Sequence, residues 1–102
     1  MSDDDTLPLS ERSFTAATAD GAVFVRVAVR GHVLGVQVEP EAMHRPGREL
    51  AERIMAAADV AYLQGQLAIR AELERGHVAA DDIDDMPTEH DLAAAHERLG
   101  KF

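Results

Sequence analysis

Two glycine turns divide residues 13–39 into three segments in which apolar residues recur at every second position. Asp20-Gly21 and Arg30-Gly31 each suit a two-residue hairpin loop, because glycine supplies the positive φ that such loops need. Loops of this length set the register of an antiparallel meander. The expected pairs are Thr18 with Val23, Ala16 with Val25 and Phe14 with Val27 across the first turn, and Val27 with Leu34, Val25 with Val36 and Val23 with Val38 across the second.

Both hairpins place apolar residues on the same side of the sheet, since side chains alternate with period two. The expected core face carries Phe14, Ala16, Val23, Val25, Val27, Leu34, Val36 and Val38. The opposite face is mixed, which suits partial exposure or a partner. It carries Thr15, Ala17, Phe24, Arg26, Ala28, Arg30, Val33, Gly35, Gln37 and Glu39.

A long helical repeat follows, from Pro46 to Arg75. Proline suits the first position of a helix, and a cation followed by Gly76 is a typical end. Apolar residues at helical spacing form two adjacent stripes on this segment. The first contains Leu50, Ile54, Ala57, Ala61, Gly65 and Ala68, and the second contains Ala56, Val60, Leu63, Leu67 and Ala71.

This apolar surface is larger than a three-stranded sheet can cover. A helix of about 28 residues is roughly 42 Å long, whereas a strand of five to eight residues reaches about 17 to 27 Å. We therefore expect a homodimer in which the second stripe, or the overhanging end, packs on a symmetry mate. The alternative is that the last helix folds back and covers the stripe within one subunit.

The expected β-β-β-α core of residues 13–75 is flanked by three further segments. Residues 1–12 are acidic and lack periodicity, which predicts a flexible leader. Residues 76–87 form an acidic linker, and residues 88–102 form a C-terminal amphipathic helix. The fold class is α+β, with a three-stranded antiparallel meander, one long α-helix and a short last helix.

Two residues mark the start of that last helix. Thr88 can cap it, and Asp91 stands three residues later as an imperfect second half of a capping box. Before the long helix, Pro40 ends the third strand because it cannot donate to a ladder, and residues 41–45 are expected to form a loop.

Charge and composition narrow the function. The chain of 102 residues has a net charge of −9 and a pI near 4.8, which weighs against nucleic-acid binding, since that draws on Lys and Arg. It has no cysteine, so thiolate metal sites and disulfides are impossible. Its acidic start and the absence of a membrane-length apolar run predict a cytoplasmic protein.

No catalytic constellation or cofactor site emerges, and we expect neither an enzyme nor a metal protein. The hydroxyl residues stand in no nucleophile motif, and the glycines form no phosphate-binding loop. His90 and His96 are six apart, where a zinc-binding helix needs a spacing of four, so exposed histidines are expected. The cluster from Asp81 to Asp85 lacks the glycine and glutamate of a calcium loop.

The chain resembles the YbaB/EbfC family over residues 13 to 74. The segments that carry the likeness are "DGAVFVRVAVRG", "HVLGVQVEPEAM" and "RELAERIMAAADVAYLQGQ". The resemblance implies a dimer, and several members of that family bind DNA in the nucleoid. This chain departs from the family pattern in having a short acidic leader where a long charged helix usually precedes the sheet.

A narrower likeness accounts for this departure. Actinobacterial EspH-like proteins, which are associated with type VII secretion, also begin with an acidic leader. They end in an acidic linker and a Pro-Thr-initiated helix, here "MPTEHDLAAAHERL". The resemblance implies a cytosolic accessory role, as a chaperone or adaptor for secreted substrates.

Two functions therefore follow as expectations. The first is a dimeric protein-interaction module whose interface uses Phe24, Val33, Ala57, Val60, Ala61, Leu63, Leu67, Leu92 and Leu99. The alternative is a nucleoid-type DNA-binding protein that uses Arg26, Arg30, Arg45 and Arg48.

Overall fold

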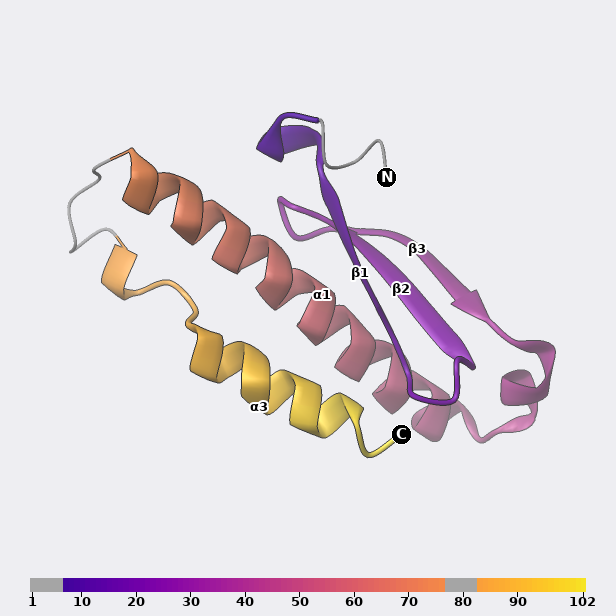
Figure 1. The fold of residues 1–102 in the computed structure, drawn as a ribbon. Helices are drawn as coiled ribbons and strands as arrows, with labels where there is room; N and C mark the ends of the chain where they lie inside the picture. Colours follow the sequence, from indigo (N-terminus) through magenta and orange to yellow (C-terminus); the bar gives the residue numbers. More distant parts are fainter. Residues whose placement is uncertain (1–6, 77–82) are drawn as a thin grey trace.

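A computed structural model describes residues 7–76 and 83–102 of the chain. The elements in order are η2 (Leu9–Glu11), β1 (Ser13–Ala17), β2 (Val23–Ala28), β3 (Val33–Val38), η3 (Pro40–His44), α1 (Gly47–Arg75) and α3 (Glu89–Leu99), where η marks a short 3-10 helix. The strands form one antiparallel sheet in the order β1-β2-β3. Helix α1 crosses one face of this sheet, and α3 runs back alongside α1 (Figure 1). The predicted α+β fold class is confirmed.

The first hairpin has the predicted register, with Phe14 opposite Val27 and Ala16 opposite Val25. Asp20 secures the turn, because its carboxylate accepts hydrogen bonds from the Thr18 hydroxyl at 2.6 Å and from the Ala22 amide at 2.9 Å. Gly21 has a φ of 73°, which is the conformation for which a glycine was expected there.

The second hairpin differs from the prediction of a two-residue loop. The Gly31 amide donates to Ala28 and the Ala28 amide donates to His32, so three residues form the loop. Gly31 has a φ of 104°, and a Cβ on it would lie 3.1 Å from the Tyr62 ring. The odd loop length shifts the first pair of the ladder by one residue.

A β-bulge then restores the predicted register. Val27 pairs with Val33, Arg26 pairs with Gly35, and Leu34 is the extra residue between them. The predicted pair of Val27 with Leu34 is therefore wrong, whereas Val25 with Val36 and Val23 with Val38 are confirmed. Because a bulge places two residues opposite one, Leu34 leaves the core face and Val33 joins it.

The core lies between the central strand and α1. Val23, Val25 and Val27 are at most 1 % exposed, and they pack with small residues of α1. Gly65 lets the helix approach β1 closely, since a Cβ there would lie 3.3 Å from the Phe14 ring.

Helix α3 covers the second stripe of α1 within the same chain. Ala95 and Leu99 of α3 belong to the same buried cluster as Ala56 and Val60 of α1. For this stripe, the expected packing on a symmetry mate is thus corrected in favour of the fold-back alternative, and packing through the overhanging end of α1 stays a prediction. Val60 is completely buried within one chain, so its side chain has no accessible surface for a contact with a second chain.

The start of α3 is fixed by the predicted cap. Thr88 accepts a hydrogen bond from the Asp91 amide at 3.4 Å, and the Asp91 carboxylate accepts one from the Thr88 amide at 2.8 Å. Both halves of the capping box are present. At the other end, Arg53 of α1 lies 4.9 Å from the centroid of the Phe102 ring.

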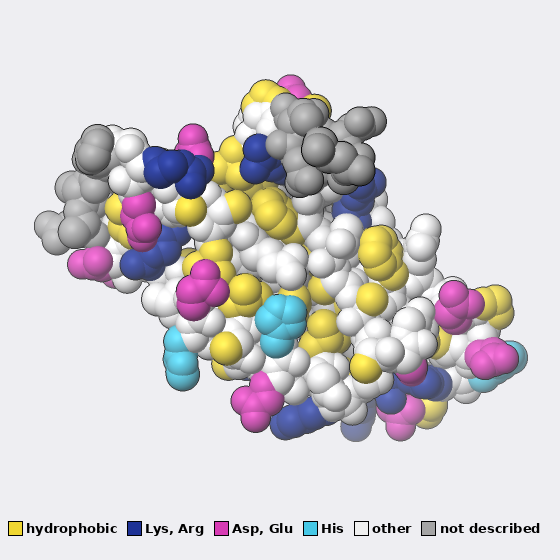
Figure 2. Space-filling model, viewed as in Figure 1, with side chains coloured by type: hydrophobic (Ala, Val, Ile, Leu, Met, Phe, Trp, Pro, Cys, Tyr) yellow, Lys and Arg dark blue, Asp and Glu magenta, His cyan; other side chains and the backbone are white. Residues whose placement is uncertain are grey.

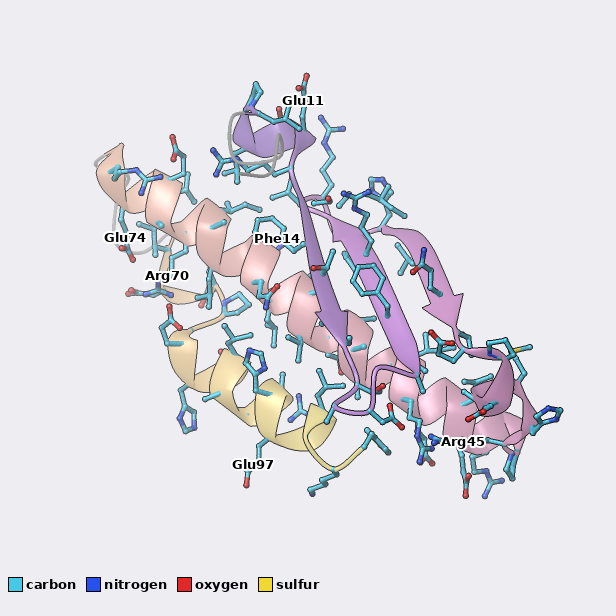
Figure 3. All side chains as sticks on the ribbon, turned by 45° about the vertical axis from the view of Figure 1, so that its right-hand side comes forward. Glu11, Phe14, Arg45, Arg70, Glu74 and Glu97 are labelled. Carbon is cyan, nitrogen blue, oxygen red and sulfur yellow. The ribbon has the colours of Figure 1, made fainter. Side chains whose placement is uncertain are left out.

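The described part of the expected linker also contacts the core. Ile83 is 6 % exposed, and Arg70 of α1 donates to the carbonyl oxygens of Ile83, Met86 and Pro87 at 3.2 to 3.5 Å. Arg70 also pairs with Glu74 at 3.0 Å (Figure 3). The connection into α3 is thereby held against the end of α1. Asp81 and Asp82 lie outside the described residues.

Residue Arg12 of the expected leader contacts the loop between β2 and β3, whereas residues 1–6 lie outside the described part of the chain. The Val29 amide donates to the Arg12 carbonyl at 3.1 Å, and Arg12 Nε donates to the Leu7 carbonyl at 2.9 Å. Residues 41–45 were expected to form a loop, but residues 41–44 belong to η3, in which Ala42 is buried.

Replacing Leu99 with alanine tests the docking of α3. We expect Leu99→Ala to lower the free energy of unfolding by about 2 to 4 kcal/mol, because it opens a cavity under a buried side chain. Chemical denaturation measures the change, and the exposed Glu97→Ala on the same helix is the control, with an effect within about 0.5 kcal/mol. Equal midpoints for the two variants would show that α3 is not part of the folding core.

Candidate interaction surface

Strand β3 lies at an edge of the sheet and is largely uncovered. Helix α1 packs chiefly against β1 and β2, and the burial of β3 reflects this. Val33, Leu34 and Val36 are 53 %, 52 % and 41 % exposed. Three large apolar side chains within four residues of one edge strand are an unusual exposure in a small chain.

Among the described residues, no strand pairs with the outer edge of β3, so this edge also carries backbone groups without a partner strand. The Glu39 amide donates to the Ala22 carbonyl at 2.8 Å, so Glu39 faces β2. Because hydrogen-bonding direction alternates along an antiparallel strand, Gln37 also faces β2, while Val36 and Val38 direct their N–H and C=O groups away from it. These groups form a short template for another strand.

The face of the sheet opposite α1 continues this surface. Phe24 of β2 is 37 % exposed. With Leu34 and Arg26 it lines a shallow depression that also includes Thr15 and Gln37. In the view of Figure 2, hydrophobic side chains are exposed over the helices as well as over the sheet, with charged side chains among and around them. We call the surface formed by Phe24, Leu34, Arg26, Thr15 and Gln37 the outer patch.

The structure divides the predicted interface residues into three groups. Ala57, Val60, Ala61 and Leu99 are buried in the core of the single chain, which removes them from any interface and corrects that assignment. Leu63, Leu67 and Leu92 are half-buried. Phe24 and Val33 are exposed.

Two exposed residues of the surface were missed by sequence reasoning. Leu34 and Val36 were assigned to the buried face. The alternation of side chains is correct for Val36, but no helix covers that position. For Leu34 the missing information was the bulge, which a three-residue loop before an apolar strand could have suggested.

The arginines proposed for DNA contact do not gather into one open site. Arg45 pairs with Asp20 at 3.2 Å, and it lies near η3 (Figure 3). Arg26 Nε donates to the Ser13 hydroxyl at 3.0 Å. Arg30 and Arg48 are exposed, on the β2–β3 loop and at the start of α1 respectively.

Asp20 joins the first hairpin to η3. The hydrogen bond from Thr18, followed by that from the Ala22 amide and the pairing with Arg45, lowers the pKa of the Asp20 carboxyl from 3.8 to about 2. Arg45 therefore has a structural role, because its ion pair with Asp20 connects the end of η3 to the turn between β1 and β2.

His32, His44, His90 and His96 are exposed as predicted, and His77 lies outside the described residues. Within residues 7–76 and 83–102, the His, Asp and Glu side chains form no cluster of three that could hold a metal ion. In the same part of the chain, each helix is too short or too polar to cross a membrane.

One comparison with known proteins gives a match. A family model described as "Protein of unknown function (DUF2694)" matches residues 8–102. Searches of curated proteins and of solved structures gave no match.

The role of Asp20 can be tested by the dependence of stability on pH. Its folded-state pKa lies below the ordinary value, so its contribution is present above about pH 4 and is lost as the pH falls toward 2. We expect Asp20→Asn to be less stable than the wild type at neutral pH, and the difference to shrink between pH 4 and 2. Thermal unfolding at each pH measures this, with the exposed Asp59→Asn as control. A difference that stays constant down to pH 2 would refute the assignment.

Proposed function

The chain belongs to the DUF2694 family, whose function is unknown, and we propose that it is a non-enzymatic, dimeric protein-interaction module. Its role would be that of a cytoplasmic accessory protein, a chaperone-like adaptor associated with type VII secretion. The observation that carries the interaction function is the uncovered strand β3, with three large apolar side chains and a free backbone edge.

The energetics of this surface favour a protein partner. An exposed apolar side chain contributes about 25 cal/mol per Å² when it is buried, and a strand edge adds main-chain hydrogen bonds to an incoming segment. Strand β3 contains no charged residue and no proline, which are the usual devices that keep an edge strand from pairing. An edge without these devices is suited to pairing with a strand of another polypeptide.

The electrostatics argue against the DNA-binding alternative. Nineteen acidic residues oppose ten basic ones, and a duplex is repelled by that net charge. Arg45 is engaged by Asp20, and Arg26 hydrogen-bonds Ser13. The secretion role rests on the resemblance to EspH-like proteins, and the exposed apolar surface supports its chaperone-like part.

Capture of a partner from the native host tests the proposal. We expect a protein to co-purify with the tagged wild-type chain and to be depleted at least tenfold by Phe24→Glu, because a charge would enter the apolar contact. Met43→Glu is the matched control, since Met43 is 62 % exposed but lies on η3. Circular dichroism checks that both variants fold.

One combination of results would contradict the proposed protein-interaction function. If no protein is enriched above a tag-only control, and a mobility shift with duplex DNA appears at low salt and weakens steeply with added salt, the chain is a DNA-binding protein.

A further inference from the structure

We infer that the free edge of β3 pairs with β3 of a second copy of this chain, antiparallel and about a two-fold axis near Val36. This inference deepens the proposed function by naming the surface of the dimer. It differs from the packing expected from the sequence, which used the second stripe of α1 or the overhanging end of that helix. Residues of α3 pack in one buried cluster with Ala56 and Val60 of that stripe.

The backbone of β3 satisfies the first requirement of such a pair. Val36 and Val38 direct their hydrogen-bonding groups outward, as the alternation from Glu39 shows. An antiparallel pair joins residues whose groups both point into the shared edge. A two-fold axis at Val36 places Val36 opposite its own copy, with both Val36 side chains on one face of the sheet.

The charges at the two ends of β3 are complementary to those of a second copy in the antiparallel orientation. Residues 33–38 are neutral, Arg30 precedes the strand, and Glu39 and Glu41 follow it. In an antiparallel self-pair the basic start of each strand lies beside the acidic end of the other. A parallel arrangement would instead place like charges together.

The other edge of the sheet is a poorer candidate. The exposed residues of β1 are Thr15 and Ala17, which are small or polar. The exposed residues of β3 include Val33 and Val36, which lie on the α1 face of the sheet but are not covered by the helix. Covering them recovers apolar area, and closing the edge satisfies backbone groups at the same time.

The geometry of the pair follows from its symmetry. Two antiparallel edge strands continue one sheet when the two-fold axis is perpendicular to it, so the dimer has six strands and both α1 helices on one face. The two outer patches then lie on the opposite face, on either side of the axis. A foreign protein would meet a doubled apolar surface there, consistent with the proposed adaptor role.

Cysteine cross-linking provides a direct test, because the chain contains no cysteine of its own. Opposing residues in an antiparallel pair have Cα atoms about 4.5 to 5.5 Å apart, within the range of a disulfide. We expect Val36→Cys, under mild oxidation, to form a covalent dimer at least tenfold faster than Met55→Cys. Met55 is 63 % exposed and lies on α1, so it controls for collision.

A second variant keeps the test independent of the choice of axis. Gln37→Cys would cross-link faster than the control if the axis lies one residue further along, and this result also supports β3 pairing. Light scattering of the unmodified chain at tens of micromolar should give about twice the mass of one 11.0 kDa chain.

Two results would overturn the inference. A dimeric mass without fast cross-linking at Val36→Cys or Gln37→Cys means that the dimer uses another surface, and the proposed interaction function stands. A monomeric mass, again without fast cross-linking, removes the pairing and the dimer together. Whether the chain binds other proteins is then decided by the capture experiment alone.

Discussion

The width of one helix determines how this sheet is covered. An α-helix with its side chains is about 10 Å across, and neighbouring strands are about 4.8 Å apart, so a single helix covers about two strands. Here α1 lies over β1 and β2, where Val23 and Val25 are fully buried. The third strand extends beyond the helix, and its apolar residues remain exposed for this reason.

The same helix has a second apolar flank, and the chain closes it with its own C-terminal helix. Leu99 and Ala95 reach Ala56 and Val60, the capping box starts α3 at Thr88, and Arg70 holds the connecting carbonyls. The chain therefore has more apolar surface than α1 and the sheet bury against each other, as the sequence indicates, and this surface lies in two places. The part on α1 is covered within the chain, and the part on β3 stays open.

Local patterns were sufficient to predict most of the fold. Strand alternation and the Asp20-Gly21 turn predicted the β1–β2 register, and helix spacing with Gly76 predicted both bounds of α1 within one residue. Thr88 and Asp91 predicted the cap of α3. Each of these depends on residues that are close in the chain.

The open surface could be predicted only in part, because exposure depends on which helix covers which strand. Val36 has the right alternation for a core residue and is exposed only because α1 lies elsewhere. Leu34 changes face through a bulge that compensates an odd loop length, a coupling between turn and strand that single-residue patterns do not contain. Of the partner residues assigned to α1, Ala57, Val60 and Ala61 are buried in the core of the single chain, whereas Leu63 and Leu67 are half-buried.

Amide hydrogen exchange in β3 tests the central claim that this strand is completed by another chain. At a protein concentration that favours the dimer, the amides of Val36 and Val38 should exchange slowly, and dilution should speed them at least tenfold. The Gln37 amide, which faces β2, should change little. If Val36 and Val38 exchange as fast as exposed loop amides at every concentration, β3 remains an open edge and the account is wrong.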